Sequence, residues 1–159
     1  MKIFKDHSQL NRQLKKHEHK KIVFTNGVFD ILHPGHIELL KFSKSKGDLL
    51  IVGINDDQSV KRIKGNNRPI FSLKERMEVL KAIEYVDFII PFSQDTPLEL
   101  IQKLFKIDIL IKGGDYLPSE VVGKNEVETA GGQLIIFKFE SPISTTSTIN
   151  KIKTLGSSN

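Results

Sequence analysis

The sequence contains no cysteine among its 159 residues. Disulfide bonds, thiolate nucleophiles and cysteine-ligated metal sites are therefore excluded. No apolar run is long enough to span a bilayer, and the N-terminal stretch MKIFKDHSQLNRQLKKHEHKK lacks the apolar core of a signal peptide. We expect no contact with a membrane and a cytoplasmic location.

The sequence also lacks a basic run interleaved with aromatic residues, although its net charge is +5 and its pI is near 9.3. This absence argues against nucleic acid as the partner. A small phosphorylated ligand would be drawn to the same positive field. The 38% hydrophobic and 27% charged residues are ordinary for a globular protein, and we expect a single domain over residues 1–159.

Apolar runs alternate with helical patterns along the whole chain. Because the connections are short, the alternation predicts an α/β fold, a single Rossmann-like, doubly wound parallel sheet of about five strands flanked by helices. The expected strands lie near residues 21–25, 49–54, 86–90, 108–111 and 134–139.

Signals at helix ends predict several boundaries. We expect the N-terminal segment, residues 1–19, to contain a helix over residues 8–19. We expect residues 156–159 to form a flexible tail. Residues 72–75 form a capping box that starts a helix, and Thr96 is expected to cap another helix with Pro97 at its first position. Residues 61–69 are expected to form a basic loop. Two further helices are each expected to have an apolar face, one formed by Leu98, Ile101, Leu104 and Phe105 and the other by Ile149, Ile152 and Leu155.

The stretch FTNGVFDILHPGH, residues 24–36, predicts a strand, a tight connection and a helix start. A helix N-terminus offers unpaired N–H groups to an anion, and Gly27 and Gly35 allow a ligand to approach the backbone. His33 and His36 have a spacing that can aim both rings at one phosphate. As an alternative, the two histidines could lie at the surface without a functional role. A zinc site is a weaker interpretation than a phosphate site, because zinc needs three or four ligands and no third ligand is evident.

Three further segments carry polar groups to expected strand or helix ends. Lys112, Gly113, Gly114 and Asp115 follow an apolar strand directly. The hydroxyl-rich residues 144–148 begin a helix and could hold phosphate, or they could simply cap it. The basic segment at 61–69 could close over an anion or remain a solvated loop.

These segments resemble a known family. The motif His33-Pro34-Gly35-His36 is similar to the HxGH motif of the cytidylyltransferase-like nucleotidyltransferases. Within that family, the closest resemblance is to the heptose 1-phosphate adenylyltransferase domain of the bifunctional enzymes that make ADP-heptose. The resemblance is carried, in order, by FTNGVFDILHPGH, VGINDDQSVKRIKG with RPI, VDFIIPFSQDTP, IKGGDY and STTSTINKI.

The resemblance implies an enzyme that transfers AMP from ATP to D-glycero-D-manno-heptose 1-phosphate, giving ADP-heptose and pyrophosphate for lipopolysaccharide biosynthesis. One alternative is a glycerol 3-phosphate or related alditol phosphate cytidylyltransferase that uses CTP. Another is a nucleotide-binding protein without catalysis. Mg²⁺ is expected to enter with ATP on the phosphate oxygens, without a metal site made by the protein.

The resemblance also assigns residues and partners. Its implied partners are ATP and a sugar 1-phosphate; a homodimer is left open, and the absence of a fused kinase domain implies a separate heptose kinase upstream. The expected catalytic residues are His33, His36 and Lys112. The expected nucleotide-binding residues are Thr25, Asn26, Gly27, Phe29, Asp30, Gly35, His36, Gly113, Gly114, Asp115, Ser144, Thr145 and Thr146, and the expected substrate-binding residues are Asn55, Asp56, Lys64, Arg68 and Arg76.

Overall fold

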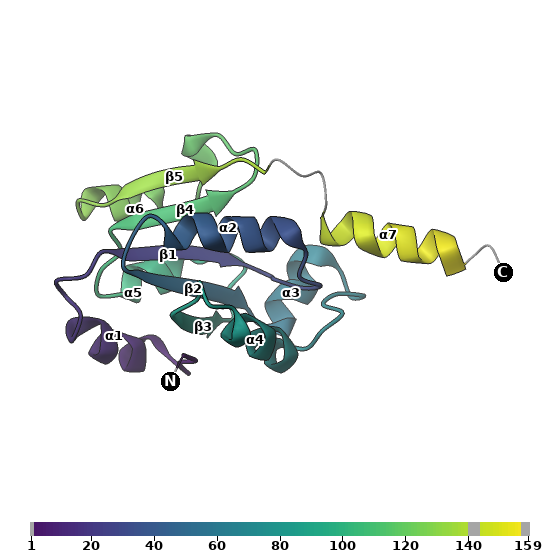
Figure 1. Cartoon of the computed structure of the whole chain (residues 1–159), viewed down its shortest axis with the longest axis horizontal. Coiled ribbons are helices and arrows are strands. Elements are labelled where there is room, and N and C mark those ends of the chain that lie inside the picture. Colours follow the sequence, from purple (N-terminus) through teal and green to yellow (C-terminus); the bar gives the residue numbers. More distant parts are fainter. Residues whose placement is uncertain (1, 140–143, 157–159) are drawn as a thin grey trace.

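A computed structural model describes residues 2–139 and 144–156 of the chain. Its centre is a five-stranded sheet in the order β3-β2-β1-β4-β5, in which every neighbouring pair is parallel (Figure 1). This confirms the Rossmann-like α/β fold expected from the alternation of strands and helices. The strands are β1 (Ile22–Gly27), β2 (Leu49–Asn55), β3 (Phe88–Phe92), β4 (Ile109–Gly113) and β5 (Gln133–Phe137).

Helices connect successive strands, as parallel pairing requires. Among the described residues, no helix is sufficiently long and apolar to cross a membrane. The helices are α1 (His7–Lys15), α2 (Pro34–Lys44), α3 (Asp57–Lys64), α4 (Leu73–Ala82), α5 (Leu98–Lys103), the short 3₁₀ helix η1 (Pro118–Glu120), α6 (Lys124–Thr129) and α7 (Thr145–Gly156).

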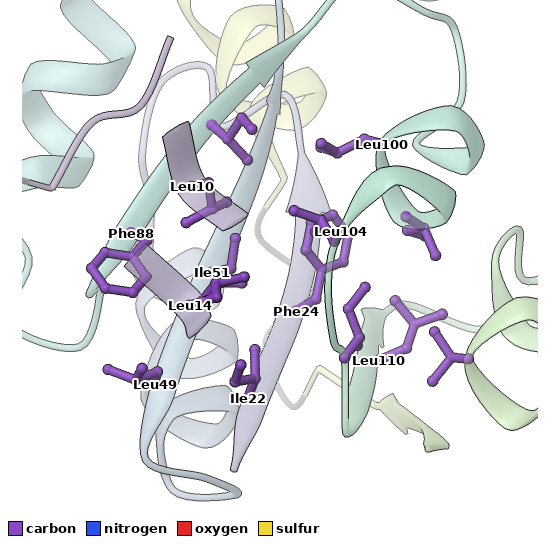
Figure 2. Packing of buried hydrophobic residues seen from close by; sticks show 14 of the residues in the cluster. Leu10, Leu14, Ile22, Phe24, Leu49, Ile51, Phe88, Leu100, Leu104 and Leu110 are labelled. Atoms are coloured by element: carbon purple, nitrogen blue, oxygen red, sulfur yellow. The ribbon is translucent and has the colours of Figure 1, made fainter. Parts of the chain in front are cut away.

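Two apolar cores lie on opposite faces of the sheet because successive strand side chains point in opposite directions. Ile22 and Phe24 of β1 join the core that includes residues of α1, α5 and α6 (Figure 2). Val23, between them, joins the core that includes residues of α2 and α4. Strands that are covered on both faces read as the continuous apolar runs seen in the sequence.

The strand order creates a crevice at one edge of the sheet. From the central strand β1, the chain runs outward through β2 and β3 and then returns to the other side for β4 and β5. The connections leaving β1 and β4 therefore diverge to opposite faces and open a crevice at the carboxyl ends of the strands. The β1–α2 connection, which contains both motif histidines, lies at this switch point.

Three predicted boundaries were wrong. Helix α1 ends at Lys15, and the basic segment expected as a loop from residue 61 begins inside α3, whose C-cap is Gly65. Pro97, and not Thr96, occupies the N-cap position of α5. The capping box of Ser72 and Glu75 at the start of α4 is confirmed by both of its hydrogen bonds.

Two predicted apolar faces also differ from the structure. Phe105, expected on the buried face of α5, lies beyond the helix and is 43% exposed. Helix α7 buries none of its residues, and Figure 1 shows it leading away from the sheet. Its periodicity therefore reflects an amphipathic helix whose apolar face lacks cover within the described chain. Of the tail expected to be flexible, residues 157–159 lie outside the described residues.

Candidate active site

A cleft of about 820 Å³ lies at the carboxyl ends of the strands. It receives residues from the ends of β1, β2 and β4, the β3–α5 connection and the start of α7. Segments far apart in the sequence thus meet at the crevice that the strand order predicts.

His33 and His36 are brought together at the start of α2. His33 is the N-cap residue, and the ring centroids of the two histidines lie 3.8 Å apart with an interplanar angle of 32°. Both side chains line the cleft. Gly35 makes room for this arrangement, since a Cβ there would lie 3.2 Å from the His33 ring. Gly35 itself does not line the cleft, and its lack of a side chain leaves room for the His33 ring.

His36 is held as a neutral ring with a defined tautomer. Burial, and secondly the neighbouring His33, lower the pKa of His36 to about 4, against an opposing effect of Asp30. The backbone N–H of His33 donates to Nδ1 of His36 over 3.3 Å. Since Nδ1 accepts, the proton of the neutral ring is on Nε2, which can donate to an anion. Burial likewise lowers the pKa of His33, and its buried Nδ1 has no hydrogen-bond partner within the described chain.

These shifts predict a pH-dependent stability. Between the ordinary pKa of 6.5 and the folded-state value of about 4, the unfolded chain binds a proton at residue 36 that the folded chain does not. The free energy of unfolding should therefore fall as the pH drops across this window, by up to about 3 kcal/mol for this one group. Urea unfolding of wild type and His36→Asn at intervals from pH 7 to pH 4 measures the difference.

The matched control for this experiment is His19→Asn, since His19 is exposed and lies outside the cleft. This variant should keep the full pH dependence of the wild type. An identical slope in His36→Asn and wild type would show that His36 already titrates normally in the folded protein.

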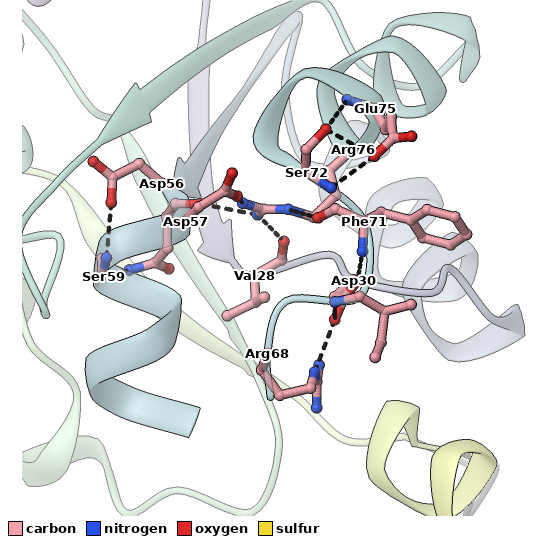
Figure 3. A network of polar contacts seen from close by, with 12 residues as sticks. Val28, Asp30, Asp56, Asp57, Ser59, Arg68, Phe71, Ser72, Glu75 and Arg76 are labelled. Carbon is pink, nitrogen blue, oxygen red and sulfur yellow. Dashed lines mark hydrogen bonds and ion pairs between the residues drawn. The ribbon is translucent and has the colours of Figure 1, made fainter. Parts of the chain in front are cut away.

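Asp30 ties three segments of the cleft together. Its carboxylate accepts hydrogen bonds from Nε of Arg68 at 2.8 Å and from the N–H groups of Ile70 and Phe71 at 2.8 and 3.0 Å (Figure 3). Burial alone would raise the pKa of Asp30, but these hydrogen bonds and the Arg68 charge lower it. Its backbone carbonyl accepts from the Thr145 hydroxyl at 2.7 Å.

The turn around Asp30 is conformationally strained. Phe29 and Ile31 have φ values of 51° and 50°, in the left-handed region that residues other than glycine rarely adopt. Such backbone strain persists only where surrounding contacts determine the conformation. The side-chain and main-chain contacts of Asp30, which lies between the two strained residues, provide that constraint.

Arg76 was expected to bind substrate, and the structure places it elsewhere. Its side chain is 1% exposed and does not line the cleft. It donates to the carbonyl oxygens of Val28, Asn55 and Phe71 and forms an ion pair with Asp57 at 2.8 Å (Figure 3). Arg76 therefore joins the ends of β1 and β2 to α4 from beneath the cleft.

The hydroxyl groups at the start of α7 have distinct partners. Ser144 Oγ accepts from the N–H of Ser147, which is the bond of an N-cap. The Thr145 hydroxyl donates to Asp30, and those of Ser147 and Thr148 donate to the Ser144 carbonyl. Thr146 lines the cleft, and its hydroxyl makes no hydrogen bond within the described chain. Helix capping and the lining of the cleft by an unpaired hydroxyl thus fall to different neighbouring residues.

Lys112 supplies positive charge to the cleft at the end of β4. Burial, and secondly the charge of Lys64, lower the pKa of Lys112, and its Nζ lies 5.5 Å from the centroid of the Tyr116 ring. Lys64 and Arg68 also line the cleft. These cations, together with the two histidines, make the cleft suitable for a ligand with several phosphate groups.

Most of the residues expected from the sequence line this cleft. They are Asn26, Gly27, Phe29, Asp30, His33, His36, Asn55, Lys64, Arg68, Lys112, Gly113, Asp115, Ser144, Thr145 and Thr146. The five expected residues that do not line the cleft are Thr25, Gly35, Asp56, Arg76 and Gly114. Thr25 is buried within β1, and Asp56 is the N-cap residue of α3. Gly114 has a φ of 131°, a backbone conformation that favours glycine, and the positions of Gly35 and Arg76 are described above.

Sequence reasoning missed several residues of the cleft. Asp95 and Thr96 come from the β3–α5 connection, and Tyr116, Glu120 and Phe139 come from segments after β4 and β5. The signal that could have found Asp95 and Thr96 was present, since polar residues at the carboxyl end of a parallel strand point to a ligand crevice. Within the described residues, no three His, Asp or Glu side chains gather as a group that could hold a metal ion.

Comparisons with known proteins show the family to which the chain belongs. Residues 24–154 match the family model described as Cytidylyltransferase-like. Proteins named bifunctional protein HldE are similar to this chain: the one from Haemophilus influenzae strain PittEE is 52% identical over 136 residues, and the one from Yersinia pestis strain Pestoides F is 49% identical over 134 residues. These alignments cover 86% and 84% of this chain but only 28% of each relative.

Solved structures share the fold. The lipopolysaccharide core biosynthesis protein from Thermoplasma volcanium GSS1 superimposes with a TM-score of 0.62 at 29% identity, covering 78% of this chain and 99% of that protein. Pantoate-beta-alanine ligase from Francisella tularensis, solved with an ATP analogue and beta-alanine, gives a TM-score of 0.60 at 19% identity, covering 89% of this chain and 69% of that protein. The second similarity concerns the fold alone.

Proposed function

The chain belongs to the cytidylyltransferase-like family, and from that premise we propose that it is an adenylyltransferase. It transfers AMP from ATP to D-glycero-D-manno-heptose 1-phosphate and releases pyrophosphate. The observation that carries the proposal is the stacked pair His33 and His36 at a helix start, facing a cleft that also contains Lys112, Lys64 and Arg68. Donors and cations arranged in this way fit a reaction that concentrates negative charge on phosphate oxygens.

The acceptor is proposed from the segments that distinguish subgroups of the family. The IKGGDY and SQDTP segments resemble those of heptose 1-phosphate adenylyltransferases, and both contribute residues to the cleft. The similarity to proteins named HldE, at 49–52% identity, and to a lipopolysaccharide core biosynthesis protein supports a sugar nucleotide as the product.

The reaction needs alignment and charge stabilisation more than it needs a strong base. An oxygen of the sugar phosphate, already an anion, attacks the α-phosphorus of ATP, while the bond to the pyrophosphate oxygen breaks on the opposite side. His36 donates from Nε2 to the phosphate oxygens on which charge develops, and His33 contacts the same phosphate oxygens. Lys112 approaches the same phosphates, and Thr146 with the first N–H groups of α7 holds the triphosphate tail.

Mg²⁺ is proposed to enter with the nucleotide. The carboxylate of Asp30 already accepts three hydrogen bonds, from Arg68, Ile70 and Phe71, and we do not assign it as a metal ligand. A cation that keeps several waters and binds mainly through substrate phosphates is compatible with such a site. When bound, it would neutralise charge on the leaving pyrophosphate.

A substrate matrix tests the proposal. Pyrophosphate release is measured for each of the four nucleoside triphosphates against heptose 1-phosphates, other sugar 1-phosphates and glycerol 3-phosphate, with acceptor-free reactions as the control. We expect the highest kcat/KM for ATP with D-glycero-D-manno-heptose 1-phosphate. Faster turnover of CTP with glycerol 3-phosphate would refute the adenylyltransferase assignment, and no release with any pair would favour binding without catalysis.

A further inference from the structure

The two halves of the cleft offer different chemistry. On the side of β2 and β3 it is lined by Asn55, Asp95 and Thr96, and on the side of β4 by Lys112 and other residues of the IKGGDY segment. The histidines lie between the halves, after the central strand β1. We infer that Asp95, together with Asn55, reads the hydroxyl groups of the acceptor sugar. This inference rests on the proposed function and adds a determinant of acceptor specificity to it.

Asp95 has one carboxylate oxygen engaged and one available. Nε of Arg62 lies 2.7 Å from Oδ1 of Asp95. Within residues 2–139 and 144–156, no hydrogen bond is made to Oδ2 of Asp95. An ionised carboxylate oxygen can only accept hydrogen bonds, so a ligand that approaches it must bring a donor. A sugar hydroxyl is such a donor, whereas a fully ionised phosphate is not.

Asn55 presents a second acceptor from an almost fully buried side chain. The residue is 3% exposed and lines the cleft. Its amide nitrogen donates to Ser59 Oγ at 2.9 Å and to the Gln94 carbonyl at 3.4 Å, which fixes the orientation of the amide. No donor reaches Asn55 Oδ1 within the described residues. Because Asn55 lines the cleft, this oxygen is left to accept a hydrogen bond from a donor on a ligand.

The connection that carries Asp95 is fixed in place on this side of the cleft. Arg62 donates both to Asp95 and to the carbonyl of Ser93, and Ser59 Oγ donates to the carbonyl of Gln94 at 2.8 Å. Helix α3, which contains Arg62 and Ser59, thus holds residues 93–95 against the end of β2. A carboxylate held in this way can select among hydroxyl positions, because a misplaced hydroxyl leaves it without its hydrogen bond.

The Arg62 charge explains how a carboxylate can lie in a cleft that receives phosphates. The side chains of Arg62 and Asp95 are 49% and 53% exposed, so solvent weakens their attraction, but the pair adds no net charge at this wall. Without Arg62, Asp95 would repel the incoming sugar phosphate. Arg62 is therefore a positioning residue that acts through Asp95.

The test compares Asp95→Asn with wild type in steady-state kinetics. Losing a charge-assisted hydrogen bond to the sugar should raise the acceptor KM by about tenfold or more, while the ATP KM changes by less than about twofold. Glu78→Gln, which alters an exposed carboxylate of α4 outside the cleft, is the matched control and should leave both KM values unchanged. A series of monodeoxy heptose 1-phosphates identifies the hydroxyl, since Asp95→Asn should have no further effect on the analogue that lacks it.

A double-mutant cycle with Arg62→Gln separates positioning from folding. In the wild-type background Arg62→Gln should raise the acceptor KM, most strongly at low salt, and in the Asp95→Asn background it should have little effect. An active wild-type enzyme whose acceptor KM and hydroxyl preferences are unaltered by Asp95→Asn would overturn the inference and leave the proposed function intact. A wild type that transfers nucleotide to no sugar phosphate would overturn both.

Discussion

Replacing His36 by alanine should lower kcat by about a hundredfold or more, since a preorganised donor to the developing charge is lost. The neutral ring has its Nε2 proton available at pH 7 because the pKa of His36 is lowered to about 4 and Nδ1 already accepts from the backbone. A hydrogen bond that strengthens only in the transition state affects kcat more than KM. His33→Ala should have an effect of the same kind, because its ring is stacked on that of His36.

Single-turnover kinetics of pyrophosphate release test this prediction, and circular dichroism shows whether each variant is folded. His19→Ala is the control, as an exposed histidine outside the cleft, and should retain wild-type kcat. A folded His36→Ala protein with unchanged kcat would exclude the histidine from catalysis. An unfolded one would show that the ring serves the packing of the turn through its contact with Phe29, whose ring centroid is 5.3 Å away.

Replacing Arg76 by methionine should lower the free energy of unfolding by about 3–5 kcal/mol, because it removes a buried cation that satisfies three carbonyl oxygens. Three carbonyl oxygens, those of Val28, Asn55 and Phe71, lose their donor, and Asp57 loses its cation. Urea unfolding monitored by circular dichroism measures the loss. The surface variant Arg12→Met should change stability by less than about 0.5 kcal/mol.

Arg68→Met is the informative comparison for Arg76→Met. Arg68 also pairs with a carboxylate, that of Asp30, but it lines the cleft. Its loss should reduce activity at temperatures where the variant is still folded, whereas Arg76→Met should lose activity only as it unfolds. A stable Arg76→Met protein with a raised acceptor KM would restore Arg76 as a substrate ligand, as the sequence had suggested.

The part of the site that the sequence predicted best is contained in one short segment. His33, Gly35 and His36 are within four residues of each other, so helix-start geometry alone brings the two rings together. The capping box of Ser72 and Glu75 and the apolar strands were also predicted from short segments of the chain. Patterns of this kind depend on contacts between near neighbours in the chain, which the order of residue types encodes directly.

The roles of Asp30, Arg76 and Asp95 were decided by the tertiary structure. Asp30 meets Arg68 38 residues later and Thr145 115 residues later, while Arg76 reaches back 48 residues to Val28. Whether a charged residue next to a motif binds a ligand or supports the backbone depends on which donors and acceptors the packed elements place around it. The sequence by itself determined the sheet, the capped start of α4 and the histidine pair, because these follow from local periodicity and capping. Only the tertiary structure distinguished the buried Arg76 from the cleft-lining Arg68, because burial and hydrogen-bond partners arise when distant segments pack together.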